Sequence, residues 1–167
     1  MKLTLLQISF LLFLNSFFVG CSLERRPNSR PAREVVTIFY QDYMNRIPRR
    51  PQNMKYSDEL QKLFDEYESI CKIKSEKDKC SWNFDRDIYL DTHAVDPKLD
   101  FKNSQFLVNE NEPGIVDVEF KIYKTLHRVR FHMIRADGDW VVDDIFYSDK
   151  STRQRLKEEV RYYYLYK

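Results

Sequence analysis

The chain has 167 residues, of which 43% are hydrophobic, 32% charged and 15% aromatic, and it contains three glycines. This length suits a single domain, and this composition excludes an intrinsically disordered chain, which lacks the apolar residues to build a core. The formal net charge of +2 excludes a strongly basic nucleic-acid binder as the default, so no nucleic-acid partner is expected.

The first twenty residues have the pattern of a secretory leader. Lys2 gives a positive start, and residues 3–19 are almost wholly apolar. The segment Phe18-Val19-Gly20-Cys21 resembles a bacterial lipobox, although Phe18 stands where Leu is usual. We expect a signal peptide over residues 1–20 and a lipid on the thiol of Cys21. An uncleaved transmembrane anchor stays open, because about 17 apolar residues is the lower limit for a span.

The segment after the lipid site is predicted to be a tether. Residues 21–33 contain Pro27, Pro31 and four arginines, which suit either contact with anionic headgroups or a solvated linker. Residues 34–167 are then one periplasmic domain, anchored to a membrane through the lipid on Cys21. Ser22 occupies the position where Asp marks retention at the inner membrane, so the outer membrane is favoured.

Two further cysteines remain after Cys21 is assigned to lipid. Cys71 and Cys80 are an even pair separated by a short polar segment, and in an oxidising compartment such a pair predicts a disulfide. A redox or zinc site is the alternative, although the spacing is not Cys-x-x-Cys and no pair of histidines lies nearby.

Two amphipathic helices are predicted before the sheet. The first covers residues 34–47 and ends before Pro48. Its expected apolar stripe consists of Val35, Ile38, Phe39, Tyr43 and Ile47. The second covers residues 57–73, with Ser57 as its N-cap. Its expected buried face consists of Leu60, Leu63, Phe64, Tyr67 and Ile70.

Short strands are predicted in the second half of the chain. A weak strand over residues 105–108 is followed by a turn over residues 111–114. Residues 116–122 and 128–133 alternate between apolar and polar side chains, which indicates strands with one buried face. Asp137-Gly138 predicts a tight hairpin turn into a strand over residues 140–145. Residues 151–154 resemble a capping box that opens a last helix, with Leu156 and Val160 inward.

Helices followed by an antiparallel meander define an α+β fold, here with N-terminal helices on a curved antiparallel sheet and a C-terminal helix. The order resembles a bacterial lipoprotein family known as domain of unknown function 3828, whose members are similar to cystatin-like or nuclear-transport-factor-2-like cones. Three stretches carry the resemblance over residues 34–156: residues 35–43, 87–94 and 140–145. Ile88 and His93-Ala94 depart from the family pattern, which often has Pro and Gln-Asp there. The resemblance implies a fold and a location, and no established activity.

The best candidate for chemistry is a polar cluster before the sheet, made of Asp87, Asp91, His93 and Asp96. An Asp beside a His in a cone pocket could transfer protons. A metal site is a weaker alternative, because no defined ligand spacing is present. The plainer interpretation is a loop in which the aspartates cap turns.

Charged residues also alternate along the predicted strands. Arg128, Arg130 and His132 share one strand face, as do Asp117, Glu119 and Lys121 on the neighbouring strand. This pattern predicts either a charged docking surface or ordinary cross-strand pairs on a wet face. In the late strand, one of Asp143 and Asp144 must point inward. We expect it to accept backbone hydrogen bonds at a strand end.

Four tyrosines stand close to the end of the sequence: Tyr162, Tyr163, Tyr164 and Tyr166. Tyrosine is enriched at protein interfaces, so they predict a partner-binding surface together with Arg128 and Arg130, unless two of them simply pack the last helix. The leading hypothesis is a non-enzymatic, membrane-tethered module that binds an envelope protein without a cofactor or a metal. The alternatives are a carrier of a small apolar ligand, an immunity lipoprotein against a delivered toxin, and a pocket enzyme using Asp91 and His93.

Overall fold

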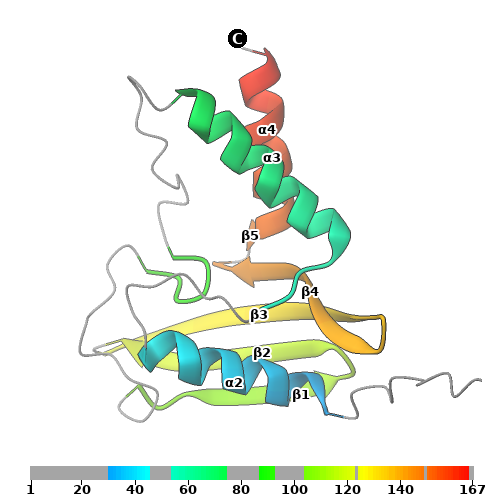
Figure 1. Cartoon of the computed structure of the whole chain (residues 1–167). Helices are drawn as coiled ribbons and strands as arrows, with labels where there is room; N and C mark the ends of the chain where they lie inside the picture. Colours follow the sequence, from blue (N-terminus) through cyan, green and yellow to red (C-terminus); the bar gives the residue numbers. More distant parts are fainter. Residues whose placement is uncertain are drawn as a thin grey trace, which may run out of the picture.

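The computed structural model describes residues 30–45, 54–74, 87–92, 104–122, 124–148 and 150–165. The described elements follow the order predicted, with helices before and after an antiparallel sheet (Figure 1). They are α2 (Ala32–Asn45), α3 (Asp58–Lys74), β1 (Leu107–Glu112), β2 (Ile115–Ile122), β3 (Thr125–Ala136), β4 (Asp139–Tyr147), β5 (Lys150–Ser151) and α4 (Thr152–Leu165). The predicted α+β class is therefore confirmed.

The sheet is an open meander in which each strand pairs with the next, in the order β1-β2-β3-β4-β5. The β1–β2 connection turns at Gly114 with φ of 79°. The β3–β4 hairpin turns at Asp137 and Gly138, whose φ values of 51° and 82° are those of a two-residue type I′ turn. The hairpin expected at this dipeptide is thus confirmed.

The two faces of the sheet differ in chemistry. Directly opposed residues share a face, and the rows Val116–Phe131–Ile145 and Val118–Val129–Tyr147 consist of buried side chains. Helix α2 lies across this apolar face near β1 and β2 (Figure 1). The opposite face carries the charged residues of β2 and β3. The alternation expected for residues 116–122 and 128–133 is confirmed.

Helix α2 buries a stripe that differs by one position from the prediction. Phe39 and Tyr43 are buried as expected, but Ile38 is 40% exposed and was wrongly placed inward. Val36 and Tyr40 are fully buried instead. The hydroxyl of Tyr40 donates to the carbonyl of Tyr89 at 2.6 Å. Tyr89 is far away in the sequence, so the periodicity of the helix could not predict this contact.

Helices α3 and α4 pack against each other and project from the β4–β5 edge of the sheet (Figure 1). Ser57 caps α3 as predicted, since the amide of Leu60 donates to its hydroxyl at 3.3 Å. The buried face of α3 is formed by Leu60, Phe64, Tyr67 and Ile70, with Leu63 half-buried against the core. The predicted face of α3 is confirmed.

The chain enters α3 beside the edge of β4. Ser57 donates its amide to the carbonyl of Val142, and the amide of Val142 donates to Lys55, both at 2.8 Å. These bonds add a short parallel bridge to β4 and fix where α3 starts. None of the described helices is long and apolar enough to cross a bilayer. The predicted leader, Cys21 and nearly all of the tether fall on residues 1–29, outside the described residues.

Candidate functional site

Asp87 closes a tight turn over residues 87–92. The turn is held by an Asp87–Thr92 bridge and by the Asp87 carbonyl, which accepts the amide of Asp91 at 2.7 Å. The Asp87 carboxylate accepts the amides of Tyr89 and Leu90 at 2.8 and 3.1 Å, as a turn-capping Asp does. Its other oxygen accepts the hydroxyl of Tyr43 from α2. These bonds support the plainer interpretation of this residue.

A cluster of buried tyrosines surrounds that carboxylate. Tyr43 and Tyr89 pack edge to face with ring centroids 5.4 Å apart, and the hydroxyls of Tyr56 and Tyr89 are hydrogen-bonded. Burial raises the pKa of Asp87 above 3.8, an effect that its hydrogen bonds partly oppose. Burial also raises the pKa of Tyr43, Tyr56 and Tyr89. The cluster joins α2, the entry to α3 and the 87–92 turn, and it keeps protons on its phenols.

The carboxylate of Asp91 binds the hydroxyl of Ser148 in the turn between β4 and β5. Asp91 and Ser148 both have left-handed backbones, with φ of 48° and 46°, and the Ser148 hydroxyl lies 2.6 and 2.7 Å from the two Asp91 carboxylate oxygens. The Nδ1 atom of His127 lies 3.1 Å from the Asp91 carbonyl oxygen. Asp91 and Ser148 both have a sparsely populated backbone conformation, and their hydrogen bonds connect the β4–β5 turn to the 87–92 turn. His93 and Asp96 lie outside the described residues, so the predicted Asp91–His93 pair stays a prediction.

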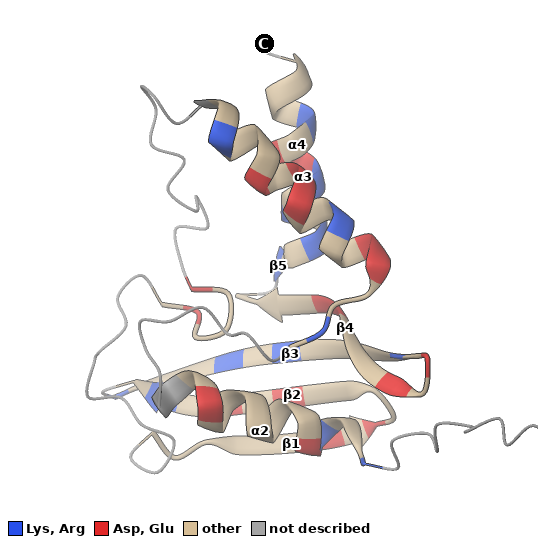
Figure 2. Ribbon diagram, in the orientation of Figure 1, with Lys and Arg blue, Asp and Glu red and all other residues tan. Residues whose placement is uncertain are grey.

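The charged residues of β2 and β3 form cross-strand ion pairs. The guanidinium of Arg130 binds both carboxylate oxygens of Asp117, at 2.6 and 3.2 Å, and its pKa is raised, chiefly by that hydrogen bond. Arg128 Nε lies 2.7 Å from a carboxylate oxygen of Glu119. Figure 2 shows the resulting arrangement, with basic positions on β3 beside acidic positions on β2. The predicted cross-strand pairs are confirmed, and the docking role stays a prediction.

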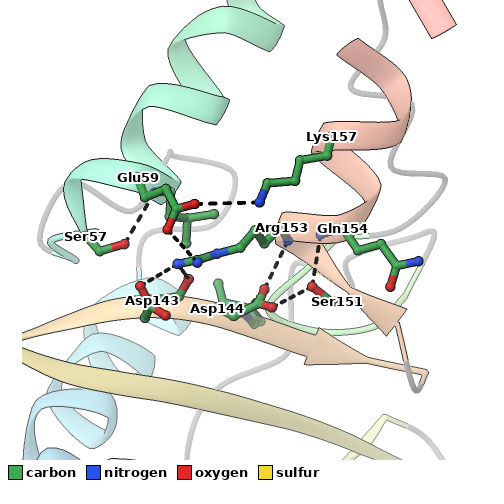
Figure 3. A network of polar contacts seen from close by, with 10 residues as sticks. Ser57, Glu59, Asp143, Asp144, Ser151, Arg153, Gln154 and Lys157 are labelled. Carbon is green, nitrogen blue, oxygen red and sulfur yellow. Dashed lines mark hydrogen bonds and ion pairs between the residues drawn. The ribbon is translucent and has the colours of Figure 1, made fainter. Parts of the chain in front are cut away.

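A polar network at the start of α4 was only partly predicted (Figure 3). Ser151 caps α4 as expected, because the amide of Gln154 donates to its hydroxyl at 3.0 Å. Asp144 is 8% exposed and accepts the amides of Ile145 and Arg153 at 2.8 and 3.0 Å. It also accepts the Ser151 hydroxyl. Asp144 is thus the inward aspartate, and it binds backbone groups as predicted.

Arg153 is the residue in this network that sequence reasoning missed. Its guanidinium donates to the carbonyl and carboxylate of Asp143 and to Glu59 of α3, the last at 2.8 Å. Lys157 also lies 3.6 Å from a Glu59 carboxylate oxygen. Arg153 therefore connects β4, α3 and α4, and it holds the helical pair on the sheet. The only hint in the sequence is that Arg153 follows the predicted cap.

The outer end of α4 presents aromatic and apolar side chains to solvent. Tyr162, Tyr164 and Leu165 are 59%, 62% and 65% exposed, while Tyr163 is buried. Ile73, in the last turn of α3, is similarly exposed. We call these four exposed residues, Ile73, Tyr162, Tyr164 and Leu165, the tip patch. Figure 1 shows that the helices carrying it extend away from the sheet. Tyr166 lies outside the described residues.

The structure describes only one of the two cysteines predicted to form a disulfide or, alternatively, a redox or zinc site. Cys71 lies half-buried near the end of α3, and Cys80 lies outside the described residues, so their bridge stays a prediction. Within the described segments, no group of three or more His, Cys, Asp or Glu side chains could hold a metal ion. Comparisons with protein-family models, with curated proteins and with solved structures found no match. The resemblance seen in the sequence is therefore an inference from the residues alone.

Proposed function

We propose that this protein is a lipid-anchored module of the bacterial envelope that binds another envelope protein through the tip patch. The anchor rests on the lipobox pattern that ends at Cys21. A tethered domain meets a partner on the same membrane at a raised effective concentration, so a small contact surface suffices. The domain would act by binding, without a cofactor.

The observation that carries the partner-binding proposal is the exposure of Tyr162, Tyr164 and Leu165 together on one helix end. A single exposed apolar residue is ordinary, but a group of them marks interaction sites. Tyrosine supplies a large contact area with little loss of conformational freedom, and tyrosines dominate the energetics of many interfaces. The Arg153 network holds this helix on the sheet, so the surface is presented on a fixed support.

The test replaces the exposed tyrosines and leaves the buried one. Deletion of residues 162–167 would also remove Tyr163, which packs into the core, so Tyr162→Ser combined with Tyr164→Ser is the sharper variant. Crosslinking in intact cells, followed by affinity capture and mass spectrometry, should show one envelope protein whose recovery falls more than about tenfold in this variant. The melting temperature should change little, because both side chains are exposed.

The control is Ile38→Ser, which removes an apolar side chain that is 40% exposed on α2, outside the tip patch. This control should retain full capture. Equal recovery of the same protein by the wild type and the double tyrosine variant would refute the role of the tip patch.

A further inference from the structure

On strands β1 to β3, the sheet face opposite α2 carries polar and charged side chains, and the contacts of α3 and α4 with the sheet are made to β4 and β5. This face carries the rows Asn109–Asp117–Arg130–Phe146 and Leu107–Glu119–Arg128, read across β1 to β4 from the strand register. Leu107, Leu126 and Ile134 are exposed on this same face. A shallow hollow of about 240 Å³ lies at its centre, between the asparagines of β1 and the arginines of β3. An antiparallel sheet with one wet face is common, so the case for a partner on this face rests on the pattern of its charges.

The charges on this face are arranged in two parallel lines. Asp117 and Glu119 follow β2, and Arg130 and Arg128 stand directly opposite them on β3. Each acidic residue therefore has a basic residue at the same height along the strands. Such a surface is complementary to itself under a twofold rotation about an axis that runs parallel to the strands, between β2 and β3, above the sheet.

We propose that this face binds a second copy of the chain, sheet to sheet, about that axis. The rotation exchanges left and right across the sheet and keeps height along the strands. It sets the Arg130 of each copy over Asp117 of the other, and Arg128 over Glu119. Each row then becomes a ring of four alternating charges, and such networks contribute more than isolated surface pairs. Homodimers with one self-complementary patch are the commonest oligomers.

A twofold axis perpendicular to the strands gives the opposite result. It would place β2 over β2 and β3 over β3, so carboxylates would meet carboxylates and arginines would meet arginines. Like charges placed together across an interface are strongly unfavourable. The charge pattern therefore selects one axis, with the sheets in the aligned packing that β-sandwiches use.

The start of α2 agrees with the same axis, in an argument that rests on the proposed lipid anchor. Trp140 Nε1 donates to the carbonyl of Arg30 at 2.9 Å, and the amide of Arg33 donates to Glu110 at 3.0 Å. The chain therefore leaves toward Cys21 beside the β3–β4 hairpin, at one end of the strands (Figure 1). A twofold axis along the strands brings both tethers to the same end, where both lipids can enter one bilayer.

The test uses two differently tagged copies of the full chain expressed in the same cells. A photo-crosslinking residue at Leu126, on the proposed interface, should join the two tags in one species of twice the mass. The same residue at Lys62, exposed on α3, should give none of this product. Arg130→Asp places aspartates against each other within and between copies, and it should lower the crosslinked fraction and the co-purification of the two tags more than about tenfold.

The charge-swapped variant, Asp117→Arg with Arg130→Asp, keeps both the internal pair and the complementarity between copies. It should restore co-purification to within about twofold of the wild type, with Arg130→Asp checked for folding by its melting curve. Absence of the double-mass product in the wild type would overturn the proposal, as would loss of co-purification in the swap. Palmitate labelling of Cys21 in the same cells reports on the anchor separately, so the two proposals fail independently.

Discussion

Asp87 has the role that the plainer interpretation of its sequence predicted. Its carboxylate accepts two backbone amides of the turn and the Tyr43 hydroxyl. The tyrosines that surround Asp87 are Tyr43, Tyr56 and Tyr89. They lie far apart in the sequence and come together only in the fold, so the sequence could not show this environment. The Asp87 carboxyl stabilises the 87–92 turn, and burial raises its pKa.

The raised pKa of Asp87 predicts a pH-dependent stability. The folded state holds the proton more tightly than the unfolded state, so the contribution of Asp87 to stability is greatest below the ordinary value of 3.8 and is lost as the pH rises through the raised folded value. Asp87→Asn keeps an oxygen for the two amides and cannot ionise. The difference between the melting temperatures of Asp87→Asn and the wild type should therefore grow in favour of the variant from about pH 4 upward. Calorimetry across this range checks it, and a constant difference would refute it.

At the scale of elements, the buried face was predicted correctly for α3 and only in part for α2, which also begins two residues earlier than predicted. Within α2, Val35 and Ile38 compete with Val36 and Tyr40 for the core, because both sets have helical spacing. The Tyr40–Tyr89 hydrogen bond decides between them, and sequence periodicity contains no information on it. Strand β1 runs to Glu112 rather than Val108, since Glu110 accepts the amides of Arg33 and Gly114 in place of packing an apolar side chain.

The bulge in β4 is a second feature that alternation could not show. The register shifts between His132 and Met133, so Asp144 pairs opposite His132 while Val142 pairs opposite Met133. The extra residue, Asp143, is free to accept Arg153 of α4. A bulge of this kind redirects a side chain at the edge where two elements join. Two adjacent aspartates in a strand were the only sign of it.

The Asp144 cap should dominate the attachment of α4 to the sheet. Asp144→Ala leaves the amide of Arg153 and the hydroxyl of Ser151 without their acceptor in a buried setting, and we expect a loss of about 2–4 kcal/mol in the free energy of unfolding. Asp139→Ala, which breaks the exposed Lys55–Asp139 pair, should cost under about 1 kcal/mol. Urea unfolding of both variants measures the contrast. Equal losses would show that Asp144 is not a structural cap.

At the scale of the whole molecule, the proposals assign separate tasks to three surfaces. The start of α2 leads to the proposed membrane anchor, the charged face of β2 and β3 is the proposed contact with the second copy, and the tip patch projects from the β4–β5 edge. A twofold axis along the strands carries the two tip patches to opposite sides of the dimer, because it reverses left and right across the sheet. Sequence reasoning found the charged pairs of β2 and β3 and the tyrosines of the tip patch. It did not find the exposed apolar residues Ile73, Leu107, Leu126 and Leu165, because their exposure depends on how the elements pack.

The proposed anchor has the most direct chemical test. Eight residues lie between Cys21 and Arg30, whose carbonyl is held by Trp140. An extended tether over these residues reaches at most about 30 Å. Cys21→Ser should abolish palmitate incorporation, move the chain to the soluble fraction and lower partner capture more than about tenfold, because the effective concentration at the membrane is lost. Cys80→Ser should keep the label and the membrane fraction, and it should abolish the Cys71–Cys80 bridge detected by mass spectrometry without reduction. Palmitate incorporation that persists in Cys21→Ser would show that the lipid is attached elsewhere. It would also remove the argument that both tethers of the proposed dimer must reach the same bilayer.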